Sequence, residues 1–311
     1  MSLNASRLVE AARPLQDRLR RSVAIALRDR VAGPDNAAKA ALIWDKPGER
    51  WFTESDPIWR VHADASMFVA GIRALLLQSL HPLAMAGVAG HSGYKGDPWG
   101  RLQRTSTFLA TTTFGTIEDA EALIERIRGI HQHVRGRAPD GRLYAASDPH
   151  LLRWVHIAEA DSFLRTHQRY AVNPLTPAEA DRYVAQSRVV ATRLGVLDPP
   201  TTVAGLDAAL ESYRAELEGT AQARDAARFL LLHPPLPWSA RPGYGALAGA
   251  GVALLPRWAQ RQLGLPSLPR TERAIALPMG GVATSVIRWA LKHPHEPGKV
   301  ASPGPPQLHG G

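Results

Sequence analysis

Residues 97–136 read DPWGRLQRTSTFLATTTFGTIEDAEALIERIRGIHQHVRG. This stretch predicts two consecutive helices, over residues 99–113 and 116–136. The second helix has a start signal, because Thr116 is a good N-cap and an acid, Asp119, stands three residues later. Helical spacing of apolar residues continues along the chain, and no stretch shows sustained alternation punctuated by hairpin turns. The sequence therefore predicts an all-α protein.

Six further helices follow from the same signals, over residues 4–32, 62–80, 149–171, 177–194, 203–219 and 271–292. Pro149 fits the first turn of one of them, and Thr176 with Glu179 gives another a capping box. The apolar run ALAGAGVALLP at 246–256 is too short to cross a bilayer. We expect it to form a buried helix or the wall of a substrate channel, and we expect no membrane span.

Composition excludes several classes of site. The 311 residues include no cysteine, which excludes disulfides, thiolate metal sites, cysteine nucleophiles and iron–sulfur clusters. The formal net charge is +9, but the basic residues are mostly arginines scattered among acids, so specific nucleic-acid binding is not expected. The N-terminus lacks the apolar core and cleavage site of a signal peptide, and we expect a cytoplasmic protein.

His131 falls on the apolar side of the helix predicted over 116–136. Apolar residues at 117, 120, 124, 127 and 134 follow steps of three and four, and His131 fills the gap on that seam. His133 is turned by about 200° from it on an α-helix, so the two cannot hold one metal ion together. A hydrogen-bonded core histidine and a metal ligand both fit the position of His131.

The preceding helix carries a polar and aromatic stripe on one face. Its members are Arg101, Arg104, Thr105, Phe108 and Thr112. A solvated surface is one interpretation, because arginine is rarely buried without a partner. The other is the positive wall of a pocket opposite His131. Such a pocket suits a haem, whose iron takes an imidazole ligand while polar donors face dioxygen.

Other metal and nucleotide motifs are missing. The sequence has no Glu-x-x-His pair for a di-iron bundle, no His-Glu-x-x-His zinc motif and no phosphate-binding glycine motif. His156 and Glu159 are one helical step apart and would supply half of a mononuclear metal site. Eight of the twelve histidines lie between residues 62 and 167. We expect the chemistry in that window.

Three segments occur in the order LLLQSLHPLAMAGVAGHSGYKGDPWGRLQRTSTFLATTTFG, RIRGIHQHVRG and DGRLYAASDPHLLRWVH. They resemble the MpaB-like oxygenase family, which includes the latex-clearing proteins, or rubber oxygenases. The resemblance implies an all-α protein with a globin-like helical core around a b-type haem (haem b). The resemblance covers about residues 55–265, the expected haem-binding core. Helix signals and composition add an N-terminal helical extension over 1–54, a C-terminal helix packed on that core over 266–293 and a proline- and glycine-rich disordered tail over 294–311.

The resemblance also implies roles for single residues. His131 matches the proximal iron ligand of the family, and Arg101 and Thr105 match its distal Arg-x-x-x-Thr pattern. Arg104 stands where rubber oxygenases have a lysine that approaches the iron, and a guanidinium does not deprotonate and so does not ligate. The sixth iron position would then hold water, stay open or take another residue.

Two histidines have open roles. His81, in LHP, is either a distal donor or base or a helix cap before proline. His156 either contacts a haem propionate, orients His131, or packs as a structural histidine beside Trp154. Rubber oxygenases use a distal carboxylate as base, whereas Asp97 is the one acid between residues 65 and 100 here. Cleavage of rubber itself is therefore not expected.

The sequence thus predicts a haem-dependent oxygenase that uses dioxygen on a small unsaturated apolar or lipid-like substrate. Arg101, Arg104, Thr105 and His81 are the residues expected on the dioxygen side. Two alternatives stay open, a non-catalytic haem-binding or haem-sensing protein and a cofactor-free helical protein that binds an apolar ligand. The oligomeric state is not indicated by the sequence.

Overall fold

The computed structural model describes residues 17–291 except 19, 32, 34 and 92–95. After a helix over residues 20–31, the elements are α2 (Asn36–Trp44), α3 (Pro57–Ala63), α4 (Met67–Gln78), α5 (Pro82–His91), α6 (Pro98–Phe114), α7 (Ile117–His133), β1 (Arg135–Arg137), β2 (Leu143–Ala145), α8 (Pro149–Tyr170), α9 (Pro177–Leu194), α10 (Val203–Ser212), α11 (Ala221–Leu232), the short helix η1 (Trp238–Ala240), α12 (Arg241–Ala253), α13 (Arg257–Gln262), α14 (Pro269–Thr271), the π-turn η2 (Glu272–Ala276) and α15 (Leu277–Leu291).

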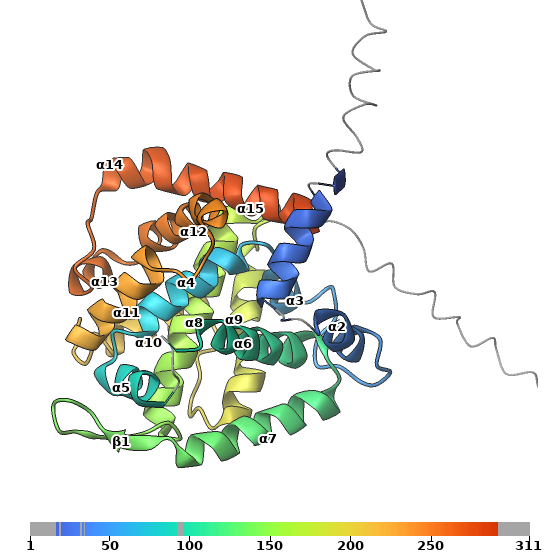
Figure 1. The fold of residues 1–311 in the computed structure, drawn as a ribbon. Helices are drawn as coiled ribbons and strands as arrows, with labels where there is room; N and C mark the ends of the chain where they lie inside the picture. Colours follow the sequence, from blue (N-terminus) through green and yellow to red (C-terminus); the bar gives the residue numbers. More distant parts are fainter. Residues whose placement is uncertain (1–16, 19, 32, 34, 92–95, 292–311) are drawn as a thin grey trace, which may run out of the picture.

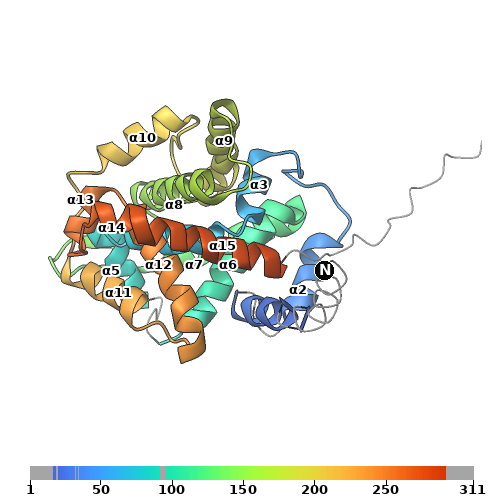
Figure 2. The ribbon, with the colours of Figure 1, turned by 90° about the horizontal axis from the view of Figure 1, so that it is seen from above.

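The protein is an all-α single domain, as the sequence predicts. Helices α4 and α8 lie side by side at its centre, with α15 at the top of Figure 1 and α7 at the bottom. Helix α12 packs between α4 and α15, and Figure 2 shows α15 lying across it. The strands in the described chain, β1 and β2, form one antiparallel hairpin.

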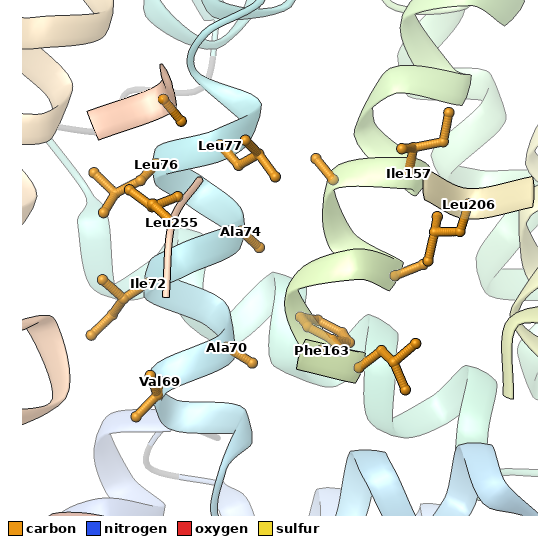
Figure 3. Packing of buried hydrophobic residues seen from close by; sticks show 14 of the residues in the cluster. Val69, Ala70, Ile72, Ala74, Leu76, Leu77, Ile157, Phe163, Leu206 and Leu255 are labelled. Carbon is orange, nitrogen blue, oxygen red and sulfur yellow. The ribbon is translucent and has the colours of Figure 1, made fainter. Parts of the chain in front are cut away.

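Two apolar faces of α4 build the core. Ala70, Ala74 and Leu77 recur at steps of four and three and point toward α8, where Ile157 and Phe163 lie (Figure 3). The face that carries Ile72 points away from α8, toward α12, whose Gly251 lies against the Ile72 side chain. A helix with two apolar faces is buried between two layers, which explains why α4 is the centre of the fold.

A buried ion pair joins these layers. The Arg73 guanidinium lies 2.7 Å from a carboxylate oxygen of Asp161, and both side chains are at most 3% exposed. Arg73 also donates to the Ser162 hydroxyl at 2.7 Å and to the Leu254 carbonyl, just after α12, at 2.9 Å. One side chain of α4 therefore fixes its position against both α8 and the end of α12.

The turn between α6 and α7 is held by residues that precede α3. The Phe114 ring stacks on Trp44, with ring centroids 4.6 Å apart, and Arg50 donates to the Phe114 carbonyl at 2.9 Å. The Ile117 amide donates to the Glu49 carbonyl at 2.8 Å. Lys46 pairs with Asp119 in the first turn of α7 at 2.8 Å. We call this set of contacts the α6–α7 corner.

Several predicted helices need correction. The helix predicted over 62–80 is two, α3 and α4, because Asp64 accepts from the Ser66 amide at 2.8 Å and pairs with Arg288, which holds the chain in a turn. The helix predicted over 203–219 ends at Ser212, and the one predicted over 116–136 ends at His133. The β1–β2 hairpin, α5, α11 and α13 were not predicted.

Other sequence predictions are confirmed. Helix α9 has the predicted bounds, with the capping box between Thr176 and Glu179, and Thr116 accepts from the Asp119 amide at the start of α7. The run at 246–256 lies mainly in α12, with Ala250 fully buried. Of the helix predicted over 4–32, the described part is helical from 20 to 31, and the tail predicted over 294–311 lies outside the described residues.

One described segment, Pro269–Leu291, is long and apolar enough to cross a membrane, with 22% of its most apolar window buried in the protein. It comprises α14, η2 and α15. Arg288, near its end, pairs with Asp64 at 3.1 Å and donates to the Tyr170 carbonyl at 3.0 Å. The segment is thus attached to α3 and α8 by polar contacts at one end.

We expect Arg73→Met to lower the free energy of unfolding by about 3 kcal/mol, because Asp161 would stay buried without its main cation. The double variant Arg73→Met with Asp161→Leu should regain much of that loss. Urea denaturation measures both. Arg128→Ala, which removes an exposed pair with Glu125, serves as the control and should cost less than about 1 kcal/mol. Equal losses in the single and double variants would contradict the prediction.

Candidate active site

His131 sits near the end of α7 on the predicted seam. Ala120 and Ile124 on that seam are buried, and His131 itself is half-buried. Its Nδ1 atom is buried and has no hydrogen-bond partner in the described chain. Burial lowers the pKa of His131 below 6.5, so its ring is neutral at neutral pH. A neutral imidazole is the form that ligates metals.

His133 behaves differently, as its position on the helix predicts. Its side chain is exposed, and its Nδ1 lies 2.8 Å from the Gly129 carbonyl of the same helix. The two neighbouring histidines therefore occupy different environments. His133 is a matched control for any experiment on His131.

The arginine stripe of α6 is divided between the interior and the solvent. Arg101 is half-buried and Thr112 is buried, whereas Arg104 and Thr105 are exposed. Arg104 pairs with the N-cap residue Asp97 at 3.2 Å. The Thr105 hydroxyl donates to the Arg101 carbonyl at 3.0 Å. The surface interpretation therefore describes Arg104 in this structure, whereas Arg101 is only partly exposed.

Apolar side chains are left uncovered on the two central helices. Leu75 of α4 is 38% exposed and Val155 of α8 is 36% exposed, although both helices form the core. The two lie near each other, because Gln78, one turn after Leu75, donates to the Val155 carbonyl at 3.2 Å. Within the described chain, the main packing partners of α6 are α2, α3 and α7, not α4 or α8. The central pair thus has a side that other helices do not cover tightly.

His156 and Glu159 share that side of α8 with Val155, being one and four residues further on. Both are half-buried. Burial lowers the pKa of His156 to about 4 and raises the pKa of Glu159 to about 7. The Nε2 atom of His156 is buried without a partner in the described residues. Titratable groups with strongly shifted pKa values cluster at functional sites, which makes this pair a candidate.

His81 lies away from α6. It is buried at the bend between α4 and α5, with its ring next to Trp154, Tyr213 and His150. Its Nδ1 is 3.5 Å from the Ala84 amide, a long version of the predicted helix cap. The expectation that His81 joins Arg101 and Thr105 is therefore not supported by its neighbours. Burial lowers the pKa of His81 below 6.5.

Tyr144 and Asp148 have structural roles. Asp148 is the N-cap of α8 and accepts from the His150 amide at 2.9 Å. The Tyr144 side chain packs closely on Gly90 and Gly136, where a Cβ would come within 3.1 and 2.7 Å of the Tyr144 oxygen. These glycines let the β1–β2 hairpin pack against α5. The hairpin in turn fixes the end of α7, where His131 stands.

A family model described as "ER-bound oxygenase mpaB/B'/Rubber oxygenase, catalytic domain" matches residues 59–289. The chain belongs to this oxygenase family. The match confirms the resemblance found in the sequence, and it includes α15 as well as the central helices. Residues 59–289 therefore form an oxygenase catalytic domain. Searches with this chain found no match among the curated proteins and none among the solved structures.

The structure brings together two residues that the sequence did not connect with any candidate site. His150 and Glu216 both lie beside His81, although His150 and Glu216 are 66 residues apart in the chain. No local sequence pattern relates His150, in the first turn of α8, to Glu216, in the segment after α10. Glu159 was noted in the sequence beside His156, and its raised pKa depends on burial that a single sequence does not reveal.

The raised pKa of Glu159 predicts a pH-dependent stability. The unfolded carboxyl ionises near pH 4.5 and the folded one near 7, so the folded state binds the extra proton between these values. Stability therefore falls as pH rises through this window. Glu159→Gln removes the effect, and the variant should gain stability relative to the parent between pH 4.5 and 7 and no further above it.

Urea denaturation at several pH values measures this difference. Glu54→Gln is the control, because Glu54 is exposed, and its difference from the parent should stay small. A Glu159→Gln difference that does not change with pH would show that the carboxyl is not buried in solution.

Proposed function

We propose that the protein is a haem-dependent oxygenase that uses dioxygen on a small unsaturated apolar or lipid-like substrate, with His131 as the proximal ligand of haem b. Family membership supports the oxygenase class. The observation that carries the cofactor proposal is the half-buried, neutral His131 with an unpartnered Nδ1 atom on the inner seam of α7. We further propose that the protein works in the cytoplasm.

The residues present fit a haem. One ring nitrogen of His131 would ligate the iron, and the hydrogen on the other would need an acceptor or a water, as it does in other ligating histidines. The partly exposed apolar side chains of Leu75 and Val155 are proposed to contact the porphyrin or an apolar substrate. Bound haem would supply the one-electron and dioxygen chemistry that protein side chains lack.

Arg101 and Thr105 are proposed to act on the dioxygen side. Arg101 is half-buried near the start of α6, and its fixed positive charge would stabilise negative charge that develops on oxygen. The Thr105 hydroxyl, which now donates to the Arg101 carbonyl, is a second donor on the same face. Arg104 is given a smaller role, because Asp97 already neutralises its charge at the surface.

Glu159 is proposed to transfer protons during the reaction, and His156 is proposed to form a hydrogen bond with a polar group of the bound cofactor or substrate. With a pKa of about 7, the Glu159 carboxyl exchanges its proton close to neutral pH, which suits a general acid or base. His156 stays neutral above about pH 4 and offers a hydrogen-bond donor to a propionate. Glu159 on α8 would then serve in place of the distal carboxylate that rubber oxygenases use as a base.

His131→Ala should remove the Soret band of the purified or haem-reconstituted protein, because the iron would lose its protein ligand. His133→Ala, two residues away on the exposed face, should keep the band at full strength. The measurement is a visible spectrum with haem typed by pyridine extraction. Retention of an unchanged band in His131→Ala would exclude His131 as the ligand, and a wild type that stays colourless with added haem would exclude the cofactor.

Arg101→Ala should keep the Soret band and slow oxygen uptake with an isoprenoid alkene by about 100-fold, the usual cost of removing a donor to developing charge. Arg104→Ala is the matched control on the same helix and should change the rate much less, since its guanidinium is bound to Asp97. Single-turnover rates separate chemistry from binding. Equal rates in the parent and in Arg101→Ala would remove Arg101 from the mechanism.

A further inference from the structure

Three metal-binding side chains from distant parts of the chain converge on one point. His81 comes from the α4–α5 bend, His150 from the first turn of α8, and Glu216 from the segment after α10. Oε2 of Glu216 lies 2.9 Å from His150 Nε2 and 3.5 Å from His81 Nε2. The three ligand atoms all lie within 4.8 Å of one another. None of these residues belongs to α6 or α7, so the cluster is separate from the site around His131.

The hydrogen bonds of His150 favour a cation between it and Glu216. The Tyr213 hydroxyl has one hydrogen, which it donates to the His150 carbonyl at 2.9 Å. Its oxygen also lies 3.3 Å from His150 Nδ1, a contact in which Nδ1 must be the donor. In the neutral ring, Nε2 then carries a lone pair, yet it faces both Glu216 oxygens at 2.9 and 3.1 Å. Two acceptors face each other unless a proton or a metal ion lies between them.

His81 points a second nitrogen at the same carboxylate. Its side chain is 2% exposed, and its Nε2 atom is buried without a hydrogen-bond partner in the described chain. A buried nitrogen of this kind normally has a partner. A metal ion shared with His150 and Glu216 would provide one.

We propose that His81, His150 and Glu216 bind a divalent transition-metal ion of the zinc class. Two imidazoles and one carboxylate are a donor set that such ions prefer. With bonds of about 2.0–2.2 Å in a tetrahedron, ligand atoms stand about 3.3–3.6 Å apart. The 3.5 Å between His81 Nε2 and Glu216 Oε2 already fits, and the 2.9 Å between His150 Nε2 and Glu216 Oε2 would lengthen on binding.

The surroundings resemble those of known metal sites in two respects. Tyr213 receives the Nδ1 hydrogen of His150, the kind of outer contact that orients a ligating histidine. The fourth position would face solvent, because the His150 and Glu216 side chains are 51% and 42% exposed. Binding requires that His81 carry its hydrogen on Nδ1 and give up the long 3.5 Å contact with the Ala84 amide.

The ion would add a cross-link between three segments that the fold already brings together. The Glu218 amide donates to the Leu80 carbonyl at 2.8 Å, which is already one link between the segment after α10 and the α4–α5 bend. A metal at Glu216 would add a bond to the bend and another to α8. Because metal binds only when the three segments are assembled, it would stabilise the folded state.

The test is calorimetric titration of the full-length, tag-free, chelator-treated protein with Zn²⁺, with thermal unfolding in the presence and absence of the ion. The parent should bind one equivalent and unfold at a higher temperature with zinc. His150→Ala and Glu216→Gln, both at exposed positions, should each weaken binding by 10-fold or more and lose the thermal shift. Tyr213→Phe should weaken binding by about 10-fold.

His133→Ala and Glu211→Gln are the matched controls, since both are exposed residues outside the cluster, and they should bind zinc as the parent does. Saturable binding that survives both His150→Ala and Glu216→Gln would place the ion elsewhere and overturn the proposal. So would the lack of saturable binding to the parent, which would identify the contact of His150 with Glu216 as an ordinary ion pair. Neither outcome depends on whether His131 binds haem.

Discussion

The ion pair between Arg73 and Asp161 is the contact on which the rest of the molecule depends. An arginine buried at this depth is tolerated only if its donors are satisfied, and here they reach a carboxylate, a hydroxyl and a carbonyl from α8 and the end of α12. The register of α4 against α8 is therefore fixed. Leu75 and Val155, on one side of this pair, and His81, just beyond α4, take their positions from it.

Helix α8 serves several parts of the molecule with different faces. Ile157 and Phe163 belong to the core that α8 shares with α4 (Figure 3). Trp154 and His150 lie toward Tyr213 and the segment after α10. His156 and Glu159 are half-buried on a further side of the helix. One 22-residue helix thus connects the proposed oxygenase site with the proposed metal cluster without any residue shared between them.

Local signals in the sequence predicted what local interactions decide. The capping box of α9 and the seam of α7 are examples, because the residues that form them are at most a few turns apart. The break between α3 and α4 was missed, since Asp64 is held there by Arg288 from the far end of the chain. Arg104 shows the same limit at the site. Its spacing fits a pocket wall equally well, and only its contact with Asp97 distinguishes the two interpretations.

The α6–α7 corner has a consequence for what counts as the unit of this protein. The family match begins at residue 59, yet Trp44, Lys46 and Arg50 contact the turn that sets the angle between α6 and α7. A fragment cut at the family boundary would leave Phe114 without its stacking partner and its carbonyl without a donor. The folded unit of this chain therefore begins before residue 59, and the segment upstream of the family match braces the turn between α6 and α7.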